Sequence, residues 1–168
     1  MNIECELRIM HACELGAVGV YRGHKCVARY FFRANLAELD NMRFHEKSHA
    51  TTFKELLKAR NARLCIANSL FFFGGLFYGV TIGMLGIKAI GTSTFTIESI
   101  VMKEFDIVLC QLPQNDPVYA EIQKIQHEEQ EHQQSGQQLA GGSHFFAPAV
   151  EMIAKFGAYT AKYLASKL

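Results

Sequence analysis

The sequence predicts an all-α protein with about six helices. Only three prolines occur, at positions 113, 117 and 148, and the long runs between them repeat apolar residues at helical spacing. Patterns typical of β-strands are weak. Because a chain of 168 residues can bury a substantial core, we expect one domain over residues 1–168.

Capping and breaking signals bound the expected helices. Asn35 and Glu38 have the spacing of a capping box at the start of the second helix. Asp116 before Pro117 predicts the start of the fifth. We expect helices at residues 4–33, 35–60, 92–112, 117–139 and 148–168, with a further one in the uncharged stretch 64–87.

Composition narrows the setting. The net charge is +1, with 17 basic and 16 acidic residues spread along the chain, so we expect no nucleic-acid partner. The five cysteines are widely spaced and form no Cys-x-x-Cys pair, which favours a reducing compartment. Glu4, Glu6 and Arg8 come too early for a secretory or transit peptide. We expect a bacterial-type cytoplasmic chain or a mature form without its leader.

Two Glu-x-x-His pairs are the first chemical signal. Glu46 pairs with His49, and Glu129 pairs with His132. Residues three apart project from the same face of a helix, so each pair can hold one metal ion. The motif is short, however, and such pairs also arise by chance.

Two single glutamates complete a repeated pattern. The order along the chain is Glu, Glu-x-x-His, Glu, Glu-x-x-His, an internal two-fold repeat. Carboxylate di-iron bundles need one Glu from each of two helices and one Glu-x-x-His from each of two others. We therefore predict a ferritin-like four-helix bundle with about two additional helices. The candidate metal ligands are Glu14, Glu46, His49, Glu98, Glu129 and His132.

These acids stand on apolar helix faces. Glu14, for example, lies between Met10 and Val18. A carboxylate in such a place costs on the order of a few kcal/mol unless it is paired or bound to metal. A buried salt-bridge network is the alternative, but no lysine or arginine occupies those faces at helical spacing.

The ligand types indicate the metal. Carboxylate oxygens with one imidazole per metal suit Fe(II) or Mn(II) better than zinc, and we expect two iron ions with O₂ as co-substrate. Cys13 is rotated by about 100° from Glu14 on the same helix. It is expected to face away and to be a packing residue.

Several segments carry a resemblance to a known family. In order and spacing, residues 6–17 (ELRIMHACELGA), 46–49 (EKSH), 96–100 (TIESI) and 128–132 (EEQEH) resemble the demethoxyubiquinone hydroxylase family of ubiquinone biosynthesis. The resemblance implies a ferritin-like fold whose six iron ligands fall on the positions named above. It also implies an O₂-dependent monooxygenase that hydroxylates a 3-demethoxyubiquinol, 2-polyprenyl-3-methyl-6-methoxy-1,4-benzoquinol.

The chain departs from this family at two places. Cys13 replaces a glycine, and residues 103–105 stand where relatives often carry a His/Tyr-rich stretch. If an aromatic hydroxyl there assists electron delivery in relatives, Tyr21 or Tyr78 would have to do so here. The electrons would come from the quinol itself or from NADH, although no Gly-rich dinucleotide fingerprint is present.

The resemblance gives the apolar segment 64–90 a functional interpretation. Residues 64–87 contain no charge and, at about 1.5 Å per residue, are long enough to cross a bilayer. We expect this segment to contact the membrane surface and the isoprenoid tail. A purely buried helix and a spanning helix remain alternatives. The candidate contacts are Leu70, Phe71, Phe72, Phe73, Leu76, Phe77 and Tyr78.

The predicted partners are therefore a polyprenylated quinol and a membrane surface. We expect peripheral association with the cytoplasmic face of a bacterial inner membrane, or with the mitochondrial inner membrane if a leader has been removed. Other ubiquinone-biosynthesis proteins and a second copy of the chain are further candidate partners. Two alternative functions stay open: iron or peroxide handling, as in ferritin and rubrerythrin, and non-catalytic quinone binding.

Overall fold

The computed structural model describes residues 2–168 and contains six α-helices and one short 3-10 turn in that range. No strand occurs among these residues, so the predicted all-α class and the number of helices are confirmed. The elements are α1 (Ile3–Phe31), η1 (Arg33–Asn35), α2 (Leu36–Ala59), α3 (Asn68–Met84), α4 (Ile87–Leu109), α5 (Pro117–Ala140) and α6 (Ala147–Lys167).

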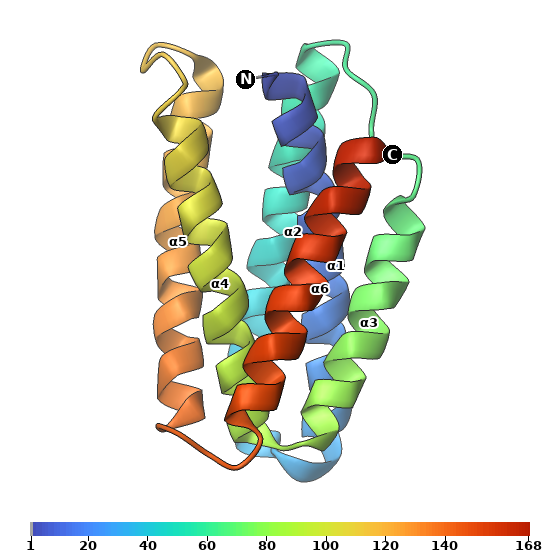
Figure 1. Ribbon diagram of the computed structural model, residues 1–168, viewed down its shortest axis with the longest axis vertical. Helices are drawn as coiled ribbons and strands as arrows, with labels where there is room; N and C mark the ends of the chain where they lie inside the picture. Colours follow the sequence, from blue (N-terminus) through green and yellow to red (C-terminus); the bar gives the residue numbers. More distant parts are fainter. Residues whose placement is uncertain (1) are drawn as a thin grey trace.

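Four of the helices form the central bundle (Figure 1). α1 packs along α2 and α4 packs along α5, and the two pairs meet where α2 contacts α5 and α1 contacts α4. α3 lies against α1 on the outside of the bundle, while α6 packs on both α4 and α1. This arrangement confirms the prediction of a ferritin-like four-helix bundle with two additional helices.

Two apolar layers fill the bundle on either side of the candidate ligands. In α2, Met42 belongs to one layer and Phe53 to the other, and Glu46 and His49 lie between them. The same alternation recurs in α1 and α4, so the candidate site lies between two dry layers. One layer contains Leu7, Met10, Phe53, Leu57, Phe105, Val108, Val118, Ile122 and Ile125; the other contains Tyr21, Ala28, Leu39, Met42 and Ile90.

One of the two predicted helix caps is present. The Asp116 side chain accepts a hydrogen bond from the Val118 N–H at 2.9 Å, and the Arg60 guanidinium donates to the same carboxylate at 2.8 Å. The capping box at Asn35 was wrong. Asn35 belongs to the 3-10 turn η1, lacks the extended backbone of an N-cap residue, and its side chain makes no capping hydrogen bond.

The uncharged stretch 64–87 is divided rather than continuous. Residues 60–67 connect α2 to α3, and Gly86, with φ of +106°, separates α3 from α4. A positive φ is accessible to glycine at no steric cost, so the chain turns there and α4 begins at Ile87 instead of at residue 92.

Among residues 2–168, none of the helices combines the length and the apolar character that a membrane span requires.

Glycines allow α1 and α3 to approach backbone to backbone. A Cβ atom on Gly75 would lie 2.0 Å from the Gly16 carbonyl oxygen, and one on Gly19 would lie 2.1 Å from the carbonyl oxygen of Phe72. Gly74 differs from its neighbour, because a Cβ atom there would meet nothing within 4 Å. Some glycines of the apolar segment are therefore needed for close helix packing, and others are not.

The contrast between the neighbouring Gly75 and Gly74 makes a matched test. We expect Gly75→Ala to lower the free energy of unfolding by about 2 kcal/mol or more, because the added methyl group clashes with backbone. Gly74→Ala is expected to raise it by about 0.5–1 kcal/mol, since alanine favours the helix. Denaturant unfolding monitored by circular dichroism measures both changes. Equal stabilities for the two variants would contradict the close packing of α1 on α3.

Candidate dinuclear metal site

The six predicted ligand side chains meet in the middle of the bundle. α1 supplies Glu14, α2 supplies Glu46 and His49, α4 supplies Glu98, and α5 supplies Glu129 and His132. Each of the six residues is at most 5% exposed. The fold therefore brings together, from four helices, all the residues that the sequence pattern selected.

The ligand atoms form two overlapping groups. One group comprises Glu14, Glu46, His49 and Glu129; the other comprises Glu46, Glu98, Glu129 and His132. Within each group the candidate atoms lie within 4.8 Å of one another. Glu46 and Glu129 belong to both groups and would be available to two bound ions, whereas Glu14 and Glu98 each belong to one group.

Both histidines turn the same ring nitrogen toward the carboxylates. His49 Nδ1 lies 2.9 Å from Glu129 Oε1 and 3.8 Å from Glu14 Oε2. His132 Nδ1 lies 2.9 Å from Glu129 Oε2 and 3.1 Å from Glu46 Oε1. The Nδ1 atoms are thus the nitrogens that could coordinate metal.

The chemistry of this cluster fits a pair of divalent cations. Among residues 2–168, the ion pairs of the four carboxylates are with His49 and His132, and no lysine or arginine pairs with any of them. Glu46 Oε1 and His49 Nδ1 are buried without a well-oriented hydrogen bond. Buried polar atoms of this kind are costly unless something else satisfies them.

Burial and mutual repulsion change how the acids ionise. Burial and the nearby Glu129 carboxylate raise the pKa values of Glu46 and Glu98 well above the usual range. Burial would also raise the pKa of Glu129, but a hydrogen bond from His132 and the adjacent His49 imidazole lower it to about 2. Although burial opposes it, the carboxylates raise the pKa of His49 to about 12 and also raise that of His132. Without metal the cluster therefore holds extra protons.

A tyrosine hydroxyl extends the cluster. The Tyr21 hydroxyl donates to Glu98 Oε1 at 3.0 Å, and Tyr21 is buried. This hydrogen bond fixes the side-chain orientation of Glu98. Tyr78, the other tyrosine that the sequence singled out, forms a hydrogen bond with Ser93 Oγ at 2.7 Å instead.

The carboxylates face a cavity of about 440 Å³ that lies between α1, α3, α4 and α6. Its volume falls within the range of small-molecule sites, about 300–1,000 Å³. Its walls are largely apolar, with Phe71 and Gly74 from α3 and Phe156 and Gly157 from α6 among the lining residues. Glu14, Glu46, Glu98 and Glu129 also line it, so the cavity gives direct access to the cluster.

The candidate tail and membrane contacts of α3 separate into different environments. Phe71 and Tyr78 line the cavity, whereas Phe73 and Phe77 point out of the protein with 62% and 76% of their surface exposed. Leu70 lines the cavity and is also exposed. The alternative of a purely buried helix is therefore wrong. Phe72 and Leu76 bring their backbone against Gly19 of α1.

Cys13 is a packing residue, as expected, but it does not face away from the site. It packs against the cluster that contains Cys65 and Phe71 and lines the cavity beside Glu14. Burial raises the pKa of the Cys13 thiol to about 12, which keeps the thiol protonated and unreactive.

Sequence reasoning missed three features of the surroundings. α6 lines the cavity and contributes an ion pair between Lys162 and Glu104 of α4 at its wall. His45 and Glu128 form hydrogen bonds with the two candidate histidine ligands. The available signal for the last two was their position, since each directly precedes the Glu of a Glu-x-x-His pair.

The fold and the site together define a class of protein. A four-helix core with one Glu from each of two helices and Glu-x-x-His from each of two others is the arrangement of ferritin-like carboxylate proteins. Comparison with known families makes the identification more specific. The sequence model of the family described as "Ubiquinone biosynthesis protein COQ7" matches residues 1–165, and the chain belongs to that family.

A curated relative agrees with the family. The chain is 27% identical over 174 aligned residues to the mitochondrial "NADPH-dependent 3-demethoxyubiquinone 3-hydroxylase" of Dictyostelium discoideum. The alignment covers 99% of this chain and 77% of the relative.

The ionisation of the cluster predicts how stability depends on pH. Above pH 6.5, the ordinary pKa of histidine, folded protein without metal retains protons on Glu46, Glu98, His49 and His132 that the unfolded chain releases. Its free energy of unfolding should therefore fall as the pH rises. Bound cations replace these protons and should weaken or reverse the trend. Buried histidines with a lowered pKa, such as His24, affect the free energy of unfolding only below about pH 6.5, where the unfolded chain protonates them.

Thermal unfolding at about pH 6.5 and 8.5, with and without Mn(II), measures this difference. The same pH dependence in both preparations would argue against a metal site at these residues.

Proposed function

We propose that this protein is a di-iron monooxygenase that hydroxylates the ring of a 3-demethoxyubiquinol with O₂. One observation carries the proposal. Four buried carboxylates line an apolar cavity large enough for a quinol ring, and two histidines lie close enough to these carboxylates to share metal ions with them. Membership of the COQ7 family and the activity for which the Dictyostelium relative is named support the same substrate class.

The donor set favours iron over zinc. Four carboxylates and two imidazoles shared by two ions give mostly hard oxygen ligands and leave coordination positions free, whereas zinc sites use fewer ligands with more nitrogen or sulfur. Bound iron would supply the capacity to bind and reduce O₂, from which the new hydroxyl group takes its oxygen atom.

The protein residues have distinct parts in this proposal. Glu46 and Glu129 would bridge the ions, and Glu14 and Glu98 would each hold one of them. The Tyr21 hydroxyl would keep the Glu98 carboxylate in place through its 3.0 Å hydrogen bond. The apolar walls of the cavity would exclude water and hold the quinol ring against the carboxylate side of the site.

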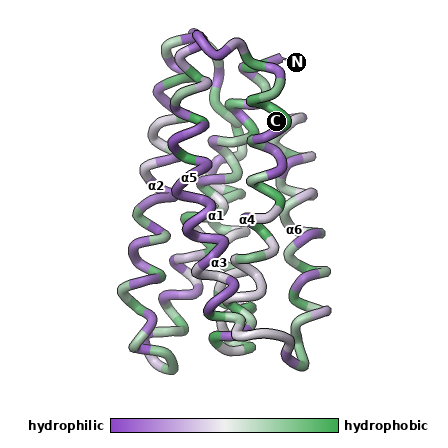
Figure 2. Tube along the Cα trace, turned by 90° about the vertical axis from the view of Figure 1, so that its left-hand side faces the viewer, coloured by the Kyte–Doolittle hydropathy of each residue, from purple (hydrophilic) through white to green (hydrophobic). Residues whose placement is uncertain are grey.

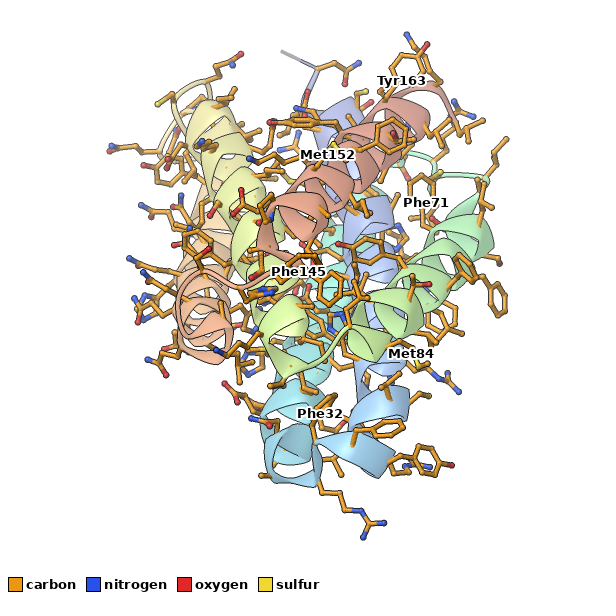
Figure 3. All side chains as sticks on the ribbon, turned by 60° about the horizontal axis from the view of Figure 1, so that its bottom comes forward. Phe32, Phe71, Met84, Phe145, Met152 and Tyr163 are labelled. Carbon is orange, nitrogen blue, oxygen red and sulfur yellow. The ribbon has the colours of Figure 1, made fainter. Side chains whose placement is uncertain are left out.

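The surface around α3 and α6 would bind the membrane. Large apolar side chains on these two helices are exposed, and Figure 3 labels three of them, Met84, Met152 and Tyr163. Both helices also line the cavity, so a tail leaving it would emerge at this surface. By contrast, the trace of α5 in Figure 2 is largely hydrophilic. The exposed set is Leu70, Phe73, Phe77, Met84, Met152, Phe156, Tyr159 and Tyr163.

The proposed setting follows from this surface. Segment 64–90, within a single di-iron domain, would be its membrane-interface and tail-binding element. The protein would associate peripherally with the bacterial inner membrane or the mitochondrial inner membrane, where its polyprenylated substrate resides. Reducing power would come from the quinol or from a reduced nicotinamide, and other biosynthetic proteins or a second copy could bind alongside.

The cavity also weighs against the two alternative functions. Iron storage and peroxide reduction act on small polar species and need no apolar cavity between α3 and α6. A non-catalytic quinone carrier would not need four buried carboxylates that have two histidines and no lysine or arginine as ion-pair partners among the described residues.

Turnover by wild-type protein and by Glu98→Ala tests the activity. With Fe(II), a demethoxyquinol and ¹⁸O₂, wild-type protein should form a hydroxylated product that carries ¹⁸O, with the quinol alone or with added NADH. Removing the Glu98 carboxylate should lower turnover by at least about 100-fold, because even outer groups around a metal are worth about 10–100-fold. His127→Ala, at an exposed position, is the control.

Two outcomes would overturn the proposal. One is a wild-type protein that binds two irons but forms no product with either electron source. The other is a Glu98→Ala protein that retains full activity, which would favour the non-catalytic carrier.

The membrane surface is tested separately by vesicle binding. Replacing both Phe73 and Phe77 with serine should weaken partitioning onto anionic phospholipid vesicles by at least about 10-fold, because each exposed phenylalanine contributes about 1.5–3 kcal/mol when it leaves water. Phe44→Ser on α2 is the matched control, since Phe44 is 65% exposed on a different helix. Equal losses for both variants in a sedimentation assay would contradict this assignment.

A further inference from the structure

Each candidate histidine ligand also forms a hydrogen bond, through its Nε2 atom, with a residue of the opposite helix. His49 Nε2 lies 2.7 Å from Glu128 Oε2 of α5, and His132 Nε2 lies 3.1 Å from His45 Nδ1 of α2. The His45 and His132 rings are also stacked, with centroids 5.2 Å apart. These contacts are on the side of the imidazoles that faces away from the carboxylates.

The two contacts follow the internal repeat of the sequence. In α2 the residue directly before the Glu-x-x-His pair is His45, and in α5 it is Glu128. Each of these residues reaches across to the histidine of the other pair. The repeat therefore extends beyond the six candidate ligands to the residues that contact the histidines. At these positions the two repeats differ chemically, because one has an imidazole and the other a carboxylate.

The hydrogen bonds fix which ring nitrogen is free to bind metal. An ionised carboxylate can only accept, so His49 donates its Nε2–H to Glu128. His132 donates its Nε2–H to His45 Nδ1 when His45 carries its own proton on Nε2. With Nε2 protonated on both rings, Nδ1 is the nitrogen that faces the carboxylates and that offers a lone pair once a bound cation displaces its proton.

The acceptors differ in charge, and this difference is passed to the ligands. A carboxylate behind a ligating imidazole increases its basicity and its donation to the metal, whereas a neutral imidazole does so less. We infer that Glu128 and His45 are positioning residues that make the two metal sites unequal, with the tighter site at His49. This inference rests on the proposed function, since it requires that the cluster hold two metal ions.

The location of Glu128 and His45 separates this role from substrate binding. Both are half-buried at the seam where α2 meets α5, and neither lines the cavity between α1, α3, α4 and α6. Changes at the two positions should therefore alter metal binding without direct contact to a bound quinol. Glu131 and His127 lie on α5 close to Glu128, are exposed, and pair with each other at 4.0 Å.

Metal titration and Mössbauer spectroscopy of the wild-type protein and five variants test the inference. Metal-free protein is titrated anaerobically with ⁵⁷Fe(II) in competition with a chelator, and the loaded samples are then measured. Wild-type protein should bind two ions with different affinities and give two quadrupole doublets. Glu128→Gln should weaken the tighter site by about 10–100-fold and shift one doublet. His45→Gln should shift the other doublet and weaken the second site less.

The controls are Glu131→Gln and His127→Ala, which should leave both affinities and both doublets unchanged. Circular dichroism of each metal-free variant checks folding, and Glu128→Asp, which keeps a carboxylate, should recover part of the lost affinity. Two equal sites in wild-type protein, or a Glu128→Gln variant that behaves like Glu131→Gln, would overturn the inference. Failure of the proposed function would give a different result. Fewer than two ions would bind, or two ions would bind with different affinities but the loaded protein would not turn over.

Discussion

Four carboxylates in a dry layer are the constraint on which the rest of this structure depends. Each of Glu14, Glu46, Glu98 and Glu129 lies between apolar layers, where an isolated charge is strongly disfavoured, and no lysine or arginine among the described residues pairs with any of them. The two histidines neutralise only part of the charge, so the other acids must hold protons or bind cations. The burial of four acids between apolar layers thus creates the requirement for cations.

The site divides the bundle into two chemically different sides. The carboxylates face the cavity, whose walls α3 and α6 make apolar, and the imidazoles face the polar seam between α2 and α5. An apolar reactant can therefore reach the carboxylates from one side while polar contacts hold the histidines from the other. The glycines of α1 and α3 contribute to this division, because they bring α3 close enough to α1 to form one wall of the cavity.

Sequence spacing predicted features that lie within one helix. Apolar residues at helical intervals around Glu46 and Glu98 placed both acids on inner faces, and the repeated order of ligands indicated four helices around one centre. Features that depend on neighbouring elements were not predictable in this way. Asn35 has a capping sequence but lies in a 3-10 turn, and α4 begins at Ile87 instead of at residue 92 because the positive φ of Gly86 lets the chain turn there. No pattern within the α6 sequence indicates that this helix lines the cavity.

The contacts of His45 and Glu128 show why an internal repeat carries more information than its motifs. A Glu-x-x-His pair describes side chains on one helix, whereas the residue before it acts on the facing helix and becomes interpretable only when the two helices are packed together. The inner ligands repeat almost perfectly, which gives two equivalent sets of donor atoms. The layer behind them does not, because one half presents a carboxylate and the other an imidazole. Two metal ions with identical surroundings would react alike. A different residue behind each histidine, on the side away from the cavity, would make the two ions chemically distinct without narrowing the cavity.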